Sequence, residues 1–462
     1  MAETSRGSGS GGGSGGEPDG DRGTAAASRG ALVGLATTAL LLVATFTTEP
    51  LFPVDVHTYF PPLHAHGMPR WGPGTLPSIV VAVVLVGFAP RLARSLSWRW
   101  LLVLAWLAGV VWMLSLALVD GVAGLAGPLE DPYEYLPAAR ALDDVPAALD
   151  GFVSRIPYAA EPLNWPPHVA GHPPGALLFF VALVRLGIDT GLGVGIVLVA
   201  LGATTPLAVA TTLRVLGAES AARVALPFLV LGPAAIWVAV SADGGVFAPT
   251  AAWGLTALAL AARRRSLAWS LLAGALLGWC VFLSYGFVLL GLLAVGVLLA
   301  ARTAYPLLGA LVGALGVTAV FLAVGFSWFE AYPVLRERYY DGLAGRRQYE
   351  YWVFGNLAAF ALSAGPLVWT GVGGFVARGP RRLLRAGSEV RVVAILGAAA
   401  VLSVLVADVS GMSKAEVERI WLPFVPWALL LVLLLPPRWR RAGLVLQALT
   451  ALVVQHLFFS KW

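Results

Sequence analysis

The chain has little charge, two lysines and a single cysteine. Charged residues make up 12% of its 462 residues, against about 25% in an average soluble domain. So few charged side chains cannot cover a water-exposed globule, which excludes a soluble enzyme. The one cysteine, Cys280, lies in an apolar run, and this excludes a disulfide framework and a cysteine metal site. No Lys/Arg block is present that would indicate a nucleic-acid partner.

Long apolar runs are what the sequence has in abundance. Hydrophobic residues make up 58% of the chain and the mean hydropathy is +0.80. A helix needs about 20 apolar residues to cross a ~30 Å hydrocarbon core. We therefore predict an all-α polytopic membrane protein in which residues 31–462 form a single transmembrane domain. Thirteen spans are expected, at 31–48, 75–92, 100–120, 191–212, 221–240, 245–262, 267–284, 287–303, 306–326, 353–377, 391–408, 420–436 and 443–459.

The distribution of charge predicts which way the chain crosses the membrane. Residues 1–30 are rich in Gly and Ser and are expected to form a disordered tail. If this tail is cytoplasmic, 20 of the 31 Lys and Arg residues fall on the inner side, as the positive-inside rule requires. Nineteen of the 25 Asp and Glu residues then fall outside. We expect a multi-pass protein of the bacterial plasma membrane whose active site is extracytoplasmic.

Three outer loops carry the polar side chains, at 121–190, 327–352 and 408–420. The first contains Glu130, Asp131 and Glu134 just after a helix end, followed by a short interfacial helix over 136–142. A carboxylate at the membrane surface can act as a general base towards an acceptor hydroxyl. The alternative is a solvated loop start, since Asp-Pro favours turns.

The first loop ends in two Pro-Pro pairs around His168 and His172. Proline pairs predict a stiff, extended backbone that holds both histidines in fixed positions; a rigid linker with solvated histidines is the alternative. The apolar segment 175–187 is too short to span, because a helix of this length covers only about 20 Å. We expect it to lie at the outer interface or to be re-entrant.

The other two outer loops combine arginines with aromatic residues. Residues 327–352 include Arg338, Tyr339 and Tyr340, and residues 408–420 include Lys414, Glu418 and Arg419. Arginine binds phosphate bidentately and aromatic rings stack on sugars and anchor at the interface. An interfacial aromatic belt and an ordinary helix-end ion pair are the alternatives. Asp243, in a short outer turn, could line the same cavity, whereas Asp120 is expected to mark only a helix terminus.

Two motifs of the first outer loop carry a resemblance to a known family: the acidic pair Glu130-Asp131 followed by tyrosine, and His172-Pro173-Pro174-Gly175 at the start of an apolar segment. Together they resemble the first outer loop of GT-C superfamily glycosyltransferases. It is most similar to the protein O-mannosyltransferase and lipid A aminoarabinose transferase branch and to actinobacterial relatives that use polyprenyl-phosphate sugars. The resemblance implies that the acidic pair, Asp131 or Glu130, supplies the catalytic carboxylate. It also implies that a basic residue before a late helix contacts the donor phosphate, which places that role on Arg419, with Lys414 second.

The resemblance implies an inverting transfer of a sugar from a polyprenyl-phosphate donor to an acceptor hydroxyl on an envelope glycan, lipid or protein. Arg338 and His172 would assist Arg419 and Lys414 in stabilising the leaving phosphate. No cofactor is required, although a divalent metal is possible. The alternative function is a transporter or lipid flippase of the cell envelope, which usually places ionisable groups near the membrane midplane. The remaining candidate substrate-binding residues are Tyr133, Glu134, His168, Tyr339, Tyr340 and Glu418.

Overall fold

The computed structural model describes residues 18–52 and 54–460, with side chains from residue 23 onward. Among these residues the fold is helical apart from two short strands. The long helices and their immediate continuations are α1 (Pro18–Leu51), α2 (Thr75–Ser95), α3 (Trp98–Ala117), α9 (Gly191–Gly202), α10 (Thr205–Val215), α11 (Glu219–Leu231), α12 (Ala235–Val238), α13 (Ala248–Arg264), α14 (Leu267–Leu283), α15 (Leu290–Ala301), α16 (Leu307–Ala323), α19 (Tyr349–Ser363), α20 (Leu367–Arg378), α21 (Pro380–Leu384), α22 (Ser388–Val409), α24 (Val425–Ala428) and α25 (Pro437–Leu457).

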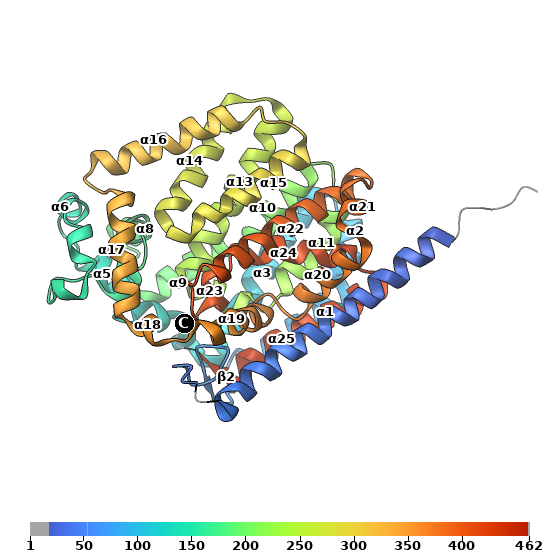
Figure 1. Ribbon diagram of the computed structural model, residues 1–462, viewed down its shortest axis with the longest axis horizontal. Coiled ribbons are helices and arrows are strands. Elements are labelled where there is room, and N and C mark those ends of the chain that lie inside the picture. The colour runs from blue at the N-terminus through green and yellow to red at the C-terminus, as the bar shows by residue number, and fades with distance from the viewer. Residues whose placement is uncertain (1–17, 53, 461–462) are drawn as a thin grey trace, which may run out of the picture.

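A second group of helices is short and comes from the expected outer loops. Figure 1 shows α5, α6, α17 and α18 at one side of the molecule, away from α21 and the start of α1. The members of this group are α4 (Gly121–Ala126), α5 (Tyr135–Arg140), α6 (Val145–Asp150), α7 (Pro167–Ala170), α8 (Gly175–Arg185), α17 (Trp328–Asp341), α18 (Leu343–Arg346) and α23 (Val417–Ile420). The helix expected over 136–142 corresponds to α5. The Pro-Pro stretch is not extended throughout, because Pro167 begins the single helical turn of α7.

Length and composition identify fewer certain membrane-spanning helices than the thirteen expected. Six helical segments of the described chain are long and apolar enough to cross a membrane, or up to eight if each of two bent pairs counts as one span. The class of all-α membrane protein therefore stands, while the thirteen-span count is not confirmed. The expected spans are helical but several are broken, as at Gly365-Pro366, where α19 and α20 meet at 105°. Gly365 has a φ of +86°, and proline cannot continue the backbone ladder.

Helix α1 begins at Pro18, inside the stretch expected to be a disordered tail. Residues 18–30 are therefore helical, and residues 1–17 of that tail lie outside the described residues. In Figure 1, α1 runs as a long helix along one side of the molecule. It packs closely on α20, where a Cβ atom added to Gly30 would lie 2.2 Å from the Gly373 carbonyl oxygen. Small residues allow this approach of two backbones, as is common between membrane helices.

Two short strands connect parts of the chain that are far apart in the sequence. Strand β1 (His66–Gly67) pairs antiparallel with β2 (Phe458–Phe459), which follows α25. The backbone N–H of Arg70 also donates to the His456 carbonyl, at 2.7 Å. The loop between α1 and α2 is thereby fastened to the segment after α25.

Candidate functional site

A buried ionic network surrounds Arg419, which lies in the single turn of α23. One guanidinium nitrogen is 3.1 Å from the Asp243 carboxylate, and both side chains are 4% exposed. The other terminal nitrogen is 3.3 Å from a Glu416 carboxylate oxygen and 2.9 Å from Nε2 of His168. Buried charges of this kind are stable only when paired and hydrogen-bonded. The Asp243 and Glu416 carboxylates raise the pKa of Arg419 although burial opposes them, so the arginine stays charged.

A strained turn before α23 directs Glu416 and Arg419 inward. Ala415 and Glu416 have φ angles of 71° and 63°, in the left-handed region that costs an L-residue roughly 1–2 kcal/mol. Asn356 of α19 holds this turn: its amide nitrogen donates to Asp408 and to the Ser413 carbonyl, and its amide oxygen accepts from the Ala415 N–H at 3.1 Å. The two successive strained residues are therefore fixed by tertiary hydrogen bonds, as is typical of functional sites.

His168 connects Arg419 to the first outer loop. Its Nδ1 lies 2.7 Å from the Glu134 carboxylate. Because arginine can only donate, Nε2 accepts from Arg419 and Nδ1 carries the proton that faces Glu134. Burial favours the neutral form of Glu134, but the neighbouring His168 and Arg419 outweigh it and lower the pKa of that carboxyl. The chain Glu134–His168–Arg419–Asp243 thus joins three segments that are far apart in the sequence.

Glu416 extends the network to a second arginine. Arg347 lies 3.4 Å from Glu416 and donates to the Lys414 carbonyl at 2.7 Å. Burial of Glu416 opposes ionisation, yet Arg419 and Arg347 together lower its pKa to about 2. Nδ1 of His64 lies 3.5 Å from Arg347. Burial chiefly lowers the pKa of His64, aided by the two arginines.

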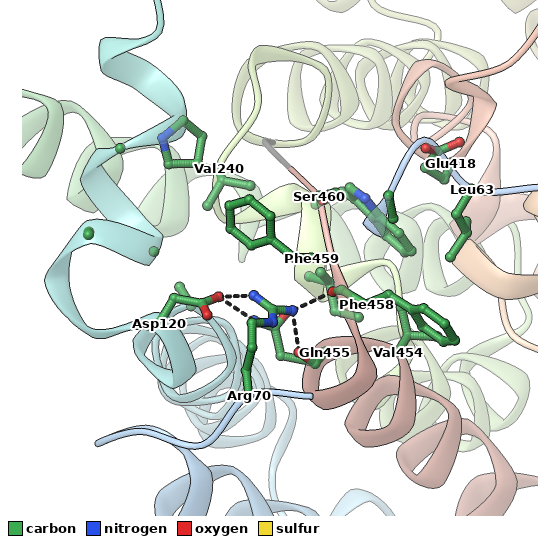
Figure 2. Close-up of a pocket in the computed structure, with 18 of the residues that line it drawn as sticks. Leu63, Arg70, Asp120, Val240, Glu418, Val454, Gln455, Phe458, Phe459 and Ser460 are labelled. Atoms are coloured by element: carbon green, nitrogen blue, oxygen red, sulfur yellow. Dashed lines mark hydrogen bonds and ion pairs between the residues drawn. The ribbon is translucent and has the colours of Figure 1, made fainter. Parts of the chain in front are cut away.

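A cavity of about 440 Å³ lies beside this network. Three carboxylate residues line it, Asp120, Asp131 and Glu418, together with the guanidinium of Arg70. Figure 2 shows Arg70 bonded to Asp120 and to backbone oxygens near Phe458, with Glu418 on another side of the pocket. Its walls come from the loop between α1 and α2, the end of α3, the first outer loop including α4, the helices α12 and α23, and the end of α25 with the segment after it. Acidic groups and a cation therefore line the same cavity.

Glu418 is the most buried carboxylate that lines this cavity, with 1% of its surface exposed. One carboxylate oxygen accepts the His64 backbone N–H at 3.1 Å, and the other has no hydrogen-bond partner among residues 18–52 and 54–460. Burial raises the pKa of Glu418 to about 7, and the nearby Glu416 charge adds to this effect. Burial therefore favours the protonated form of the Glu418 carboxyl group.

The two carboxylates expected to be catalytic lie in different surroundings. Asp131 is half-buried, lines the cavity and accepts the Tyr133 N–H at 2.9 Å. Glu130 is exposed and forms a two-pronged ion pair with Arg140, at 2.6 and 2.7 Å, while also accepting the Gly191 N–H. The hydrogen bond from Arg140 is the largest cause that lowers the pKa of Glu130. Glu130 thus fastens the start of α9 to α5.

None of the four residues predicted to bind the donor phosphate lines this cavity: Arg419, Lys414, Arg338 and His172. Lys414 donates to the carbonyls of Ala344 and Arg347 and lies over the Tyr340 ring. Arg338 is buried and donates to the carbonyls of Ile156 and Trp165, so it fastens α17 to the first loop. Nδ1 of His172 lies 2.8 Å from the Tyr135 hydroxyl.

The predicted substrate-binding residues are divided between the network and the surface. Glu134, His168 and Glu418 belong to the network and the cavity wall, as described above. Tyr133 is 58% exposed and lines a separate surface hollow next to Pro132. Tyr340 is exposed, whereas Tyr339 is half-buried, and burial raises the pKa of the Tyr339 hydroxyl.

Arg70 and Asp120 were not predicted as site residues, although both line the cavity and pair with each other. Asp120 is thus more than a helix terminus. The sequence does contain a signal for Arg70, because it is the one Lys or Arg residue between the first two expected spans, on the side where arginine is scarce. Across residues 18–52 and 54–460, no group of three or more His, Cys, Asp or Glu side chains is placed to hold a metal ion.

The fold and the site together define an all-α protein with apolar, membrane-length helices and a polar cavity near one end of them. Comparison with known proteins adds no family to this description: no protein-family model matches the chain, and no curated protein sequence matches it significantly.

Proposed function

We propose that the protein is an integral membrane glycosyltransferase that moves a sugar from a polyprenyl-phosphate donor to an acceptor hydroxyl at the extracytoplasmic face. The observation that carries this proposal is the meeting of two outer loops at one cavity. Asp131 of the first loop and Glu418 of the last line the same volume of about 440 Å³. His168 and Arg419 join the same two loops by a direct 2.9 Å contact.

In this proposal Asp131 accepts the proton of the acceptor hydroxyl while the oxygen attacks the anomeric carbon. The bond from that carbon to the phosphate oxygen breaks, and its electron pair leaves with the polyprenyl phosphate. Asp131 is preferred to Glu130, because both oxygens of Glu130 are engaged by Arg140. Arg70 supplies the cation that lines the cavity, and the leaving phosphate gains charge in the transition state.

Arg419 has a positioning role in this arrangement. Unlike Arg70, it does not line the cavity. Only 4% of its side chain is exposed, and Asp243 and Glu416 pair with it. It holds α23 against the first loop and so fixes the distance between Glu418 and Asp131. A displacement of this wall by about 1 Å is enough to cost roughly 100-fold in rate.

Transfer of a labelled sugar tests the proposal directly. Purified protein in liposomes is supplied with polyprenyl-phosphate-linked hexoses and pentoses and with envelope glycan, lipid and peptide acceptors. Loss of the Asp131 carboxylate in Asp131→Asn is expected to reduce transfer by about 100-fold or more, the usual contribution of a general base. The matched control is Asp143→Asn, an exposed carboxylate of the same loop that lines no part of the cavity. Absence of transfer with every donor, or full activity in Asp131→Asn, would reject the proposal.

Transport is the second candidate function, because Asp243 begins the π-helical turn Asp243–Phe247 within a membrane-length helix and is buried against Arg419. Buried ionisable groups at broken helices are a feature of transporters. Movement of a fluorescent polyprenyl phosphate across protein-containing liposomes, without sugar transfer, would favour this function over the first.

A further inference from the structure

A second cavity, of about 710 Å³, is lined by Arg378, Arg382 and Arg440. We call it the inner arginine cavity. Its walls are the start of α1, the end of α20, α21 and the chain from Leu433 into α25. Figure 1 places α21 and the start of α1 away from α23 and β2, which adjoin the candidate site, so the two cavities are separate.

Two of the cavity's arginines carry charge that no carboxylate balances among the described residues. Arg378 and Arg440 are half-buried, and neither forms an ion pair with any described residue. Arg378 donates to the Leu434 carbonyl at 2.8 Å, a contact that orients the guanidinium without neutralising it. Partly burying like charges in one cavity is unfavourable unless an anion compensates them.

Apolar side chains form much of the remaining lining, including Leu383 and the run Leu433–Leu435. An anion with a hydrocarbon portion fits a cavity that combines guanidinium groups with leucine side chains. Arginine pairs bidentately with phosphate oxygens, and basic pockets between helices on the cytoplasmic side bind anionic headgroups. We propose that the inner arginine cavity binds the phosphate headgroup of an anionic phospholipid from the membrane. This site is independent of the sugar transfer proposed above.

Native mass spectrometry of the full chain, released from micelles, tests the site. Wild-type protein is titrated with phosphatidylglycerol, with zwitterionic phosphatidylcholine and with inorganic phosphate. Wild type is expected to retain phosphatidylglycerol in preference to the other two. The double variant Arg378→Gln/Arg440→Gln is expected to bind it about tenfold more weakly or worse, given the contribution of each arginine to headgroup binding.

Two further variants separate the site from general surface charge and from misfolding. Arg264→Gln/Arg265→Gln removes two exposed arginines from the same expected face and is expected to leave phosphatidylglycerol binding unchanged. Arg378→Lys/Arg440→Lys keeps the charge and is expected to restore most of the binding. An unchanged affinity in the glutamine variant, or an equal loss in the control, would overturn the site. Inorganic phosphate that competes fully with phosphatidylglycerol would overturn the assignment to a lipid.

Discussion

Replacement of Arg419 by methionine tests whether the buried network holds the outer loops together. Methionine retains much of the length of the side chain but leaves the Asp243 and Glu416 carboxylates without their shared cation. Removing one partner of a buried ion pair typically costs about 3–5 kcal/mol. We expect Arg419→Met to lower the free energy of unfolding by this amount, which is a large part of the total stability of a typical protein.

The loss is measured by reversible unfolding in mixed micelles, followed by tryptophan fluorescence. Arg214→Met is the matched control, because Arg214 pairs with Glu219 at 2.9 Å but both side chains are about 40% exposed. An exposed pair contributes about 0–1 kcal/mol. Asp243→Asn in the Arg419→Met background should recover about 1–3 kcal/mol, since the uncompensated carboxylate is removed. A loss in Arg419→Met no larger than that in Arg214→Met would refute the reasoning.

Three further predictions concern individual side chains. Burial raises the pKa of Glu418 to about 7 in the folded protein, so the folded state retains a proton that the unfolded state loses, and the free energy of unfolding falls as the pH rises from about 4.5 to 7. Glu418→Gln should therefore be more stable than wild type at pH 8, by roughly 2–4 kcal/mol. Unfolding of both proteins over a series of pH values measures this difference. Glu130→Gln should cost about 1 kcal/mol or less, since its ion pair is exposed, and should leave more transfer activity than Asp131→Asn in the liposome assay. Asn356→Ala removes three hydrogen bonds of the turn before α23 and should cost about 2–4 kcal/mol in the same unfolding assay; a loss below about 0.5 kcal/mol would show that the turn needs no such support.

The class of fold could be predicted from composition, because apolar runs and scarce charge leave few alternatives to membrane helices. The number of spans could not be predicted in the same way. Hydropathy does not record where Gly365-Pro366 bends a helix, nor that the expected span at 420–436 is divided among α23, α24 and the 3-10 segment Leu429–Leu434. Such breaks are set by local backbone geometry and by packing against neighbours.

Only some residues of the candidate site could be predicted from the sequence. The first and last outer loops were singled out because they carry clustered polar residues, and the structure does bring His168 to Arg419. The roles within the loops were less predictable. Arg338 and Lys414 bind backbone carbonyls, whereas Arg70 and Asp243, which stand alone in short segments, make the central charge contacts. A sequence pattern gives the density of charge along the chain, but pairing across 176 or more positions depends on the tertiary fold.

The fastening of Arg70 to the segment after α25 has a consequence for biogenesis. Its guanidinium binds carbonyl oxygens that lie 385 and 388 positions later in the chain. Strand β1 pairs with β2 across a similar sequence separation. Arg70 can therefore reach these carbonyl oxygens only after the chain from α2 through α25 has been synthesised. A chain that stops before Gln455 lacks both carbonyl acceptors of Arg70, strand β2 and the wall residues Phe458 and Phe459, so this side of the cavity cannot form.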